Sequence, residues 1–97
     1  MAELIWSEES LSDLERIYDY IARDSRVYAQ YQVESICKSA ERLCWFPESG
    51  RHLPEFPDLP HREIIVDNYR ILYRYDSPGE VKIVAVVHGR QLLNRPC

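Results

Sequence analysis

The chain has 97 residues, a length that predicts one domain over residues 1–97 and excludes two of ordinary size. Hydrophobic residues make up 45% and charged residues 29%, which favours a folded soluble protein over a disordered one. The net charge of −4 argues against a general nucleic-acid-binding protein, because phosphate neutralisation supplies most non-specific affinity. No apolar run is long enough to cross a membrane and no signal peptide is evident, so we expect a cytoplasmic protein without a membrane partner.

The cysteines and histidines give no metal or redox motif. The chain has an odd number of cysteines, Cys37, Cys44 and Cys97, and no two of them have CxxC spacing. This argues against a disulfide framework and against a zinc site. His52 and His61 have no ligand partners at metal-site spacing, and we expect both at the surface or at a cap. We therefore expect no metal and no cofactor.

The first half of the chain predicts one strand followed by two helices. An apolar run over residues 2–6 indicates the strand, and Ser7 follows it as a candidate helix N-cap. Apolar residues spaced three and four apart predict helices over residues 8–23 and 27–45, the second ended by Pro47. Helices joined by so short a link are expected to pack as an antiparallel hairpin.

The second half predicts a loop and three strands. Residues 47–60 are rich in proline and turn residues, and we expect an ordered loop with a short strand near residues 51–56. Alternation of apolar and polar residues then predicts strands over residues 62–66, 69–75 and 80–87, the last β-branched and expected to be central. The order β-α-α-β-β-β predicts an α+β fold, with the N-terminal helical hairpin packed on a small, mainly antiparallel sheet.

Most candidate functional residues in the second half are basic: Arg51, Arg62, Arg70, Arg74, His88 and Arg90. If these side chains share one surface, they form a cationic patch beside an imidazole. Such a patch could stabilise a phosphorane-like transition state or bind an acidic peptide. We also expect that Arg62 and Arg70 face each other across a hairpin. The alternative is that Arg62 pairs with a carboxylate while Arg70 and Arg74 lie on a solvated sheet face. Glu55 is either a general base beside these groups or an ordinary loop carboxylate.

The chain resembles the RelE/ParE toxin superfamily of bacterial type II toxin–antitoxin systems, also called plasmid stabilisation proteins. The resemblance covers residues 3–93 and depends on the order and spacing of several short segments rather than on any one of them. These segments are Ile5-Trp6-Ser7, residues 13–22, Pro47-Glu48-Ser49-Gly50-Arg51, Arg62-Glu63-Ile64, Tyr69-Arg70-Ile71-Leu72-Tyr73 and Val87-His88-Gly89-Arg90.

The resemblance implies the same fold and a toxin held inactive by a cognate antitoxin in a hetero-oligomeric complex. Such antitoxins lay an extended or helical segment with acidic and hydrophobic residues over the toxin. The predicted partner-binding residues are the six basic ones, Arg51, Arg62, Arg70, Arg74, His88 and Arg90.

The superfamily divides by mechanism. ParE-like members inhibit DNA gyrase and are not known to catalyse a reaction, whereas RelE-like members are ribosome-dependent mRNA endoribonucleases. We favour the ParE-like branch, because the Gly50-Arg51 loop and the Tyr69-Arg70-Ile71 strand match it and only two lysines are present. If the chain is instead a ribonuclease, which alone would require direct nucleic-acid binding, the candidate catalytic residues are Glu55, Arg62, Arg70 and His88. A third alternative is a non-toxic module that only binds the antitoxin.

Overall fold

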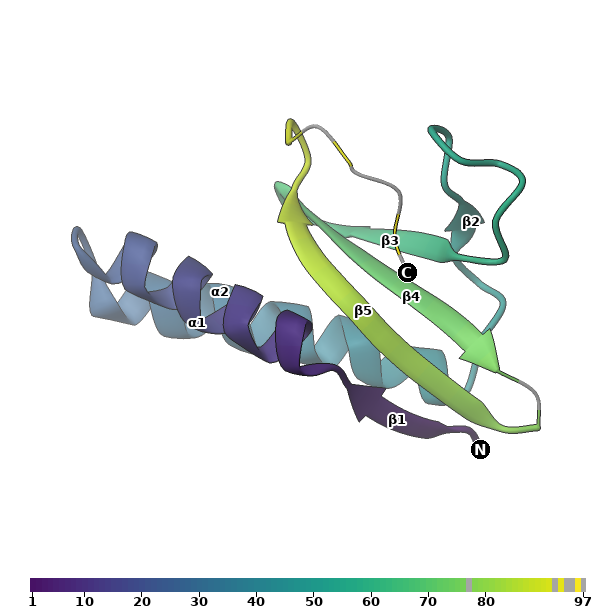
Figure 1. Cartoon of the computed structure of the whole chain (residues 1–97). Helices are drawn as coiled ribbons and strands as arrows, with labels where there is room; N and C mark the ends of the chain where they lie inside the picture. The colour runs from purple at the N-terminus through teal and green to yellow at the C-terminus, as the bar shows by residue number, and fades with distance from the viewer. Residues whose placement is uncertain (77, 92, 94–95, 97) are drawn as a thin grey trace.

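Two helices pack on one face of a five-stranded sheet in the computed structural model, which describes residues 1–76, 78–91, 93 and 96 (Figure 1). Ser77 of a predicted turn and Cys97 lie outside the described residues. The elements in chain order are β1 Glu3–Trp6, α1 Glu8–Ala22, α2 Arg26–Glu41, a 3₁₀ turn at Arg42–Cys44, β2 Arg51–His52, β3 Arg62–Val66, β4 Tyr69–Asp76 and β5 Glu80–His88. The predicted α+β fold is confirmed.

Both helices begin at a serine cap. The Ser7 hydroxyl accepts a hydrogen bond from the Ser10 amide at 3.0 Å, and the Ser25 hydroxyl accepts one from the Tyr28 amide at 3.1 Å. Each bond satisfies one of the amides that a helix start leaves without an intrahelical partner. The α-helical part of α2 stops at Glu41, earlier than predicted, because its last turn tightens to 3₁₀ geometry before the chain reaches the proline-rich loop.

The sheet order is β1-β5-β4-β3-β2, with β1 parallel to β5 and all other neighbours antiparallel. β4 is the middle strand, and β5 is also an inner strand paired on both sides, as its β-branched sequence predicts. β5 lies second in the sheet, flanked by β4 and by the N-terminal strand. β1 comes from the opposite end of the chain and pairs in parallel with β5. Local patterns of apolar and polar residues do not predict this β1–β5 pairing.

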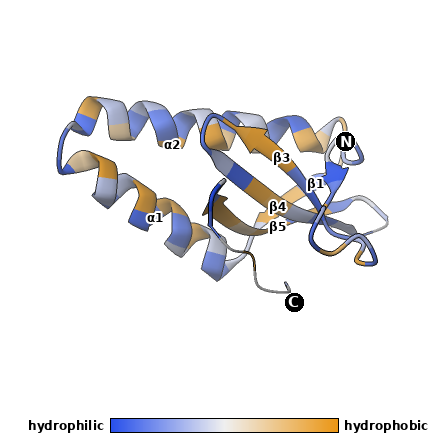
Figure 2. Cartoon of the chain, turned by 90° about the horizontal axis from the view of Figure 1, so that it is seen from above, coloured by the Kyte–Doolittle hydropathy of each residue, from blue (hydrophilic) through white to orange (hydrophobic). Residues whose placement is uncertain are grey.

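The sheet has a helix side and an open side. The main core lies on the helix side, where Ile71 and Tyr73 of β4 meet Ile36 of α2, and all three are fully buried. On the open side a smaller cluster forms where the loop between β2 and β3 places Leu53 against Leu72. Hydrophobic and hydrophilic residues alternate along both helices (Figure 2). The loop therefore covers part of the open side and brings its polar residues close to β4.

A β-bulge in β5 changes which of its residues face the helices. Leu72 pairs with Ala85 but Tyr73 pairs with Ile83, so Val84 is an extra residue between the two pairs. Val81 and Ile83 face the helices before the bulge, and Val86 faces them after it. His88 consequently comes to the helix side, opposite Tyr69 of β4. Without the bulge His88 would point to the open side.

The N-cap of α1 and one of its side chains hold β5 where β1 no longer reaches it. β1 ends at Trp6, opposite Ile83. Beyond that point the Ser7 hydroxyl donates to the Val84 carbonyl at 3.0 Å, and the Asp13 carboxylate accepts from the Val86 amide at 2.9 Å. These bonds satisfy backbone groups at the bulge that would otherwise be buried without partners.

Candidate functional site

Two arginines and two glutamates form a carboxylate–arginine cluster on the open side of the sheet: Arg51, Glu55, Glu63 and Arg70. Glu63 is 1% exposed and Arg70 is 6% exposed. The Glu63 carboxylate accepts from Nε of Arg51 and from Nε of Arg70, both at 2.7 Å. The register explains this contact, because Glu63 pairs with Leu72 and so lies diagonally across from Arg70 on the same side of the sheet.

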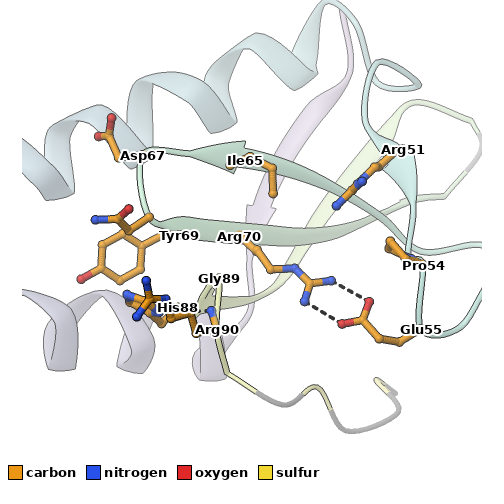
Figure 3. A pocket seen from close by; sticks show the side chains of 11 residues that line it. Arg51, Pro54, Glu55, Ile65, Asp67, Tyr69, Arg70, His88, Gly89 and Arg90 are labelled. Atoms are coloured by element: carbon orange, nitrogen blue, oxygen red, sulfur yellow. Dashed lines mark hydrogen bonds and ion pairs between the residues drawn. The ribbon is translucent and has the colours of Figure 1, made fainter.

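Glu55 completes the cluster from the loop between β2 and β3. Its two carboxylate oxygens accept from Nη1 and Nη2 of Arg70 at 2.7 and 2.9 Å, as the dashed lines show (Figure 3). Nη2 of Arg70 also pairs with Glu63. The hydrogen bonds of Arg70 hold the pKa of Glu55 below its usual range, and the two carboxylates raise the pKa of Arg70. Both groups therefore stay charged at neutral pH and neutralise each other.

A pocket of about 360 Å³, here called the arginine pocket, opens beside this cluster (Figure 3). Arg51 lies at its edge with 63% of its side chain exposed, and Arg90 is also exposed. Nδ1 of His88 accepts from the Arg90 amide at 3.2 Å, which leaves the proton of a neutral imidazole on Nε2. The residues lining the pocket are Arg51, Pro54, Glu55, Ile65, Asp67, Asn68, Tyr69, Arg70, His88, Gly89 and Arg90.

Arg62 lies outside the arginine pocket. The expectation that Arg62 and Arg70 face each other is wrong, because Arg62 pairs with Tyr73 while Arg70 pairs with Ile65. The two arginines consequently point to opposite sides of the sheet. Nη1 of Arg62 donates to the carbonyl oxygens of Glu48 and Gly50 at 3.1 and 2.8 Å, and these bonds fasten the loop that precedes β2.

Arg74 also lies outside the arginine pocket, near the end of β4. It forms hydrogen bonds with Asp76 at 2.8 and 3.1 Å. Of the six predicted basic residues, the pocket brings together Arg51, Arg70, His88 and Arg90.

Glu63, the carboxylate that joins the two arginines, was not among the predicted site residues. In the sequence it stands between Arg62 and Ile64 as one polar residue of an alternating strand, and no spacing signal marks it as buried. His61, expected at the surface or at a cap, is buried at 3% exposure. Within the described residues, no three His, Cys, Asp or Glu side chains are grouped as a metal site would require.

The fold is that of the RelE/ParE toxins. It is similar to the chromosomal ParDE toxin–antitoxin system of P. aeruginosa, with a TM-score of 0.76 and 23% identity over 91% of this chain and 96% of the other. It is also similar to the toxin–antitoxin complex RelBE2 of Mycobacterium tuberculosis, with a TM-score of 0.67 and 20% identity over 90% and 96% of the two chains.

Sequence comparison gives the family. Residues 4–93 match the family described as the ParE toxin of type II toxin–antitoxin systems, parDE. Toxin RelE2 of Caulobacter vibrioides is 32% identical over 92 residues, covering 95% of this chain and all of that protein. The chain therefore belongs to the ParE toxin family within the RelE/ParE superfamily. In the described part of the chain, neither helix has the length and apolar character that crossing a membrane requires.

Proposed function

We propose that this toxin inhibits DNA gyrase by binding it, without catalysing a reaction, and that a cognate antitoxin keeps it inactive in a hetero-oligomeric cytoplasmic complex. One observation carries the choice of mechanism. The guanidinium of Arg70, the most central arginine of the site, donates from Nε, Nη1 and Nη2 to Glu55 and Glu63. It has the geometry of a structural ion pair and not of a phosphate ligand.

A ribonuclease needs arginines able to stabilise the charge that develops on the scissile phosphate. Arg70 would have to release Glu55, with which it forms a two-pronged pair, before it could contact an RNA phosphate. Glu55 and Glu63 also neutralise Arg51 and Arg70, so the cluster has no net positive charge with which to attract a phosphate. The net charge of −4 further weakens attraction to the ribosome.

A protein partner suits the remaining cations better. Arg90 is exposed at the arginine pocket, and Arg51 is 63% exposed although its Nε already bonds to Glu63, so both can meet carboxylates of a partner. An antitoxin with acidic side chains and the contact surface of gyrase can both meet this requirement. A toxin–antitoxin pair of this kind would maintain the plasmid or chromosomal segment that encodes it.

The proposal is tested by the order of arrest after the toxin is induced without antitoxin. Thymidine and methionine incorporation are followed in one culture, and purified toxin is added to a gyrase supercoiling assay. We expect DNA synthesis to stop first and supercoiling to be inhibited. An earlier stop in protein synthesis, with normal supercoiling, would contradict gyrase inhibition.

The alternative function is ribosome-dependent cleavage of mRNA. It is favoured by Glu55, Arg70 and His88 all lining one pocket, although the His88 side chain lies on the helix side of the sheet and Arg70 on the open side. In this case His88→Ala should abolish toxicity while antitoxin affinity stays nearly unchanged, and translating ribosomes should show cut mRNA. If the toxin only binds antitoxin, induction should leave growth unaffected.

A further inference from the structure

The guanidinium of Arg70 meets two carboxylates along two different edges. Glu63 accepts from Nε at 2.7 Å and also pairs with Nη2, so it lies along one side of the group. Glu55 accepts from Nη1 and Nη2 at 2.7 and 2.9 Å and therefore lies across its end (Figure 3). Two parallel hydrogen bonds to one group are also the way in which an arginine binds a phosphate. Glu55 consequently occupies the place that a phosphate would take on Arg70.

The two carboxylates differ in burial, and this decides which of them separates Arg70 from the arginine pocket. The side chains of Glu63 and Arg70 are buried, whereas 38% of the Glu55 side chain is exposed. Glu63 is thus a fixed partner inside the sheet, and Glu55 is the outer cover of the guanidinium. Without Glu55, the end of the guanidinium would face the pocket while Glu63 still held its side.

The loop between β2 and β3 presents Glu55 in a defined position. Leu53 is fully buried and packs against Leu72 on the open side of the sheet. The Phe56 amide donates to the Leu53 carbonyl at 3.1 Å, which closes a turn around Glu55. A carboxylate placed by its own chain loses little freedom when it binds, whereas an anion from solution loses its translational freedom. Glu55 therefore has an advantage over any dissolved phosphate.

Charge in and around the arginine pocket is balanced only while Glu55 is present. With His88 neutral, three positive and three negative side chains meet there: Arg51, Arg70 and Arg90 with Glu55, Glu63 and Asp67. Loss of the Glu55 carboxylate would leave one net positive charge beside an uncovered guanidinium. The pocket volume of about 360 Å³ leaves room for a phosphate group at that position. Such an arrangement attracts phosphate.

We propose that Glu55 is the specificity-determining residue of the arginine pocket: it fills an oxyanion site on Arg70 and thereby keeps the phosphates of nucleic acids out of the free toxin. This inference deepens the proposed function, because it names the side chain that leaves the site without affinity for RNA. It also gives Glu55 a role opposite to that of the general base in the alternative function, which would have to accept a proton beside a bound phosphate.

The test is a titration of the isotopically labelled, full-length toxin with inorganic phosphate, followed by NMR at constant ionic strength. It compares wild type with Glu55→Ala and Asp67→Asn. Asp67 also contributes a carboxylate to the pocket, but the donor to that carboxylate is Gln32, at 3.1 Å. Asparagine tolerates the φ of 54° at this position. Asp67→Asn therefore removes the same charge and leaves Arg70 covered.

We expect Glu55→Ala to bind phosphate at least about tenfold more tightly than wild type, with a shift of the Arg70 Nε–H signal. Asp67→Asn should stay within about threefold of wild type. Wild type binding as tightly as Glu55→Ala, or no binding by a folded Glu55→Ala, would overturn the proposal. Equal gains in the two variants would also overturn it, because net charge rather than the covering of Arg70 would then control binding.

A second titration uses an RNA dinucleotide, which contains a single phosphodiester. Glu55→Ala should bind this probe more tightly than wild type as well. If the variant binds inorganic phosphate alone, the site takes free phosphate, and the exclusion of nucleic acid by Glu55 is wrong.

Glu55→Gln replaces the alanine variant if that variant does not fold. Glutamine keeps the length of the side chain, but its amide nitrogen cannot accept a bond from Arg70, so the guanidinium is covered less well. Its affinity for phosphate should be at least about threefold above that of wild type. Unchanged affinity in the folded glutamine variant would contradict the assignment.

Failure of this inference can be told apart from failure of the proposed function. The titrations measure phosphate binding by the free toxin, whereas the order of arrest reports on the target in the cell. If protein synthesis stops first while the titrations give the expected result, gyrase inhibition is wrong and the assignment of Glu55 stands. If DNA synthesis stops first but wild type binds phosphate as tightly as Glu55→Ala, the assignment alone is wrong.

Discussion

Replacing Arg70 by alanine should destabilise the toxin severely. Arg70 is 6% exposed and bonds to Glu63, which is 1% exposed and would keep only Arg51 as a partner. Removing one member of a buried ion pair costs about 3–5 kcal/mol, because the other charge stays buried without full compensation. A chain of this size has about 5–15 kcal/mol of total stability, so the loss is a large part of it.

Urea and thermal unfolding measure this loss, with Arg74→Ala as the matched control. Arg74 lies on the same side of β4 and also pairs with a carboxylate, but 31% of its side chain is exposed. The control should cost at most about 1 kcal/mol. For Arg70→Ala the melting temperature should fall by about 12 °C or more. A loss below about 1 kcal/mol would refute the reasoning, because the guanidinium would then be available to bind a phosphate.

Three further predictions concern pH, packing and the bulge. The pKa of Glu55 is lower in the folded state than its unfolded-state value of about 4.3, so its carboxylate stabilises the fold fully above that pH. This stabilisation is lost as the pH falls through the lower, folded-state pKa. Urea unfolding of Glu55→Gln should therefore lose less stability than wild type between pH 7 and pH 3. Gly50→Ala should cost about 1–3 kcal/mol in the same assay, since its Cβ would lie 2.6 Å from the Tyr73 hydroxyl. Asp13→Ala should cost about 1–3 kcal/mol and speed hydrogen exchange at the Val86 amide, which loses its acceptor.

Much of the fold could be predicted because its signals are local. The strand Arg62–Val66 was predicted with its observed bounds, and α1 was predicted to within one residue, because apolar periodicity and a serine cap act over a few residues. The turn at Asp67-Asn68 was equally visible, since these residues tolerate the left-handed backbone that Asp67 adopts.

The site could be predicted only in part, because it depends on register and on one inserted residue. The Arg70 side chain was expected to meet solvent, phosphate or partner, yet strand register places it beside Glu63. The bulge at Val84 then brings His88 to the helix side, a change of one residue that no composition signal marks. Contacts between strands far apart in sequence therefore decided which charged groups are neutralised and which remain exposed.

The parallel pairing of β1 with β5 has a consequence for the order of folding. The Ser7–Val84 hydrogen bond beside this pairing joins residues 77 positions apart. Closing a loop of that length costs about 4 kcal/mol of chain entropy, whereas the helical hairpin and the β3–β4–β5 meander close over short turns. The two layers can therefore form early as separate units, and the sheet is completed only when the first strand docks beside the last. We expect docking of β1 to be the late step, and trimming the residues before Ser7 to speed unfolding in stopped-flow fluorescence more than it slows refolding.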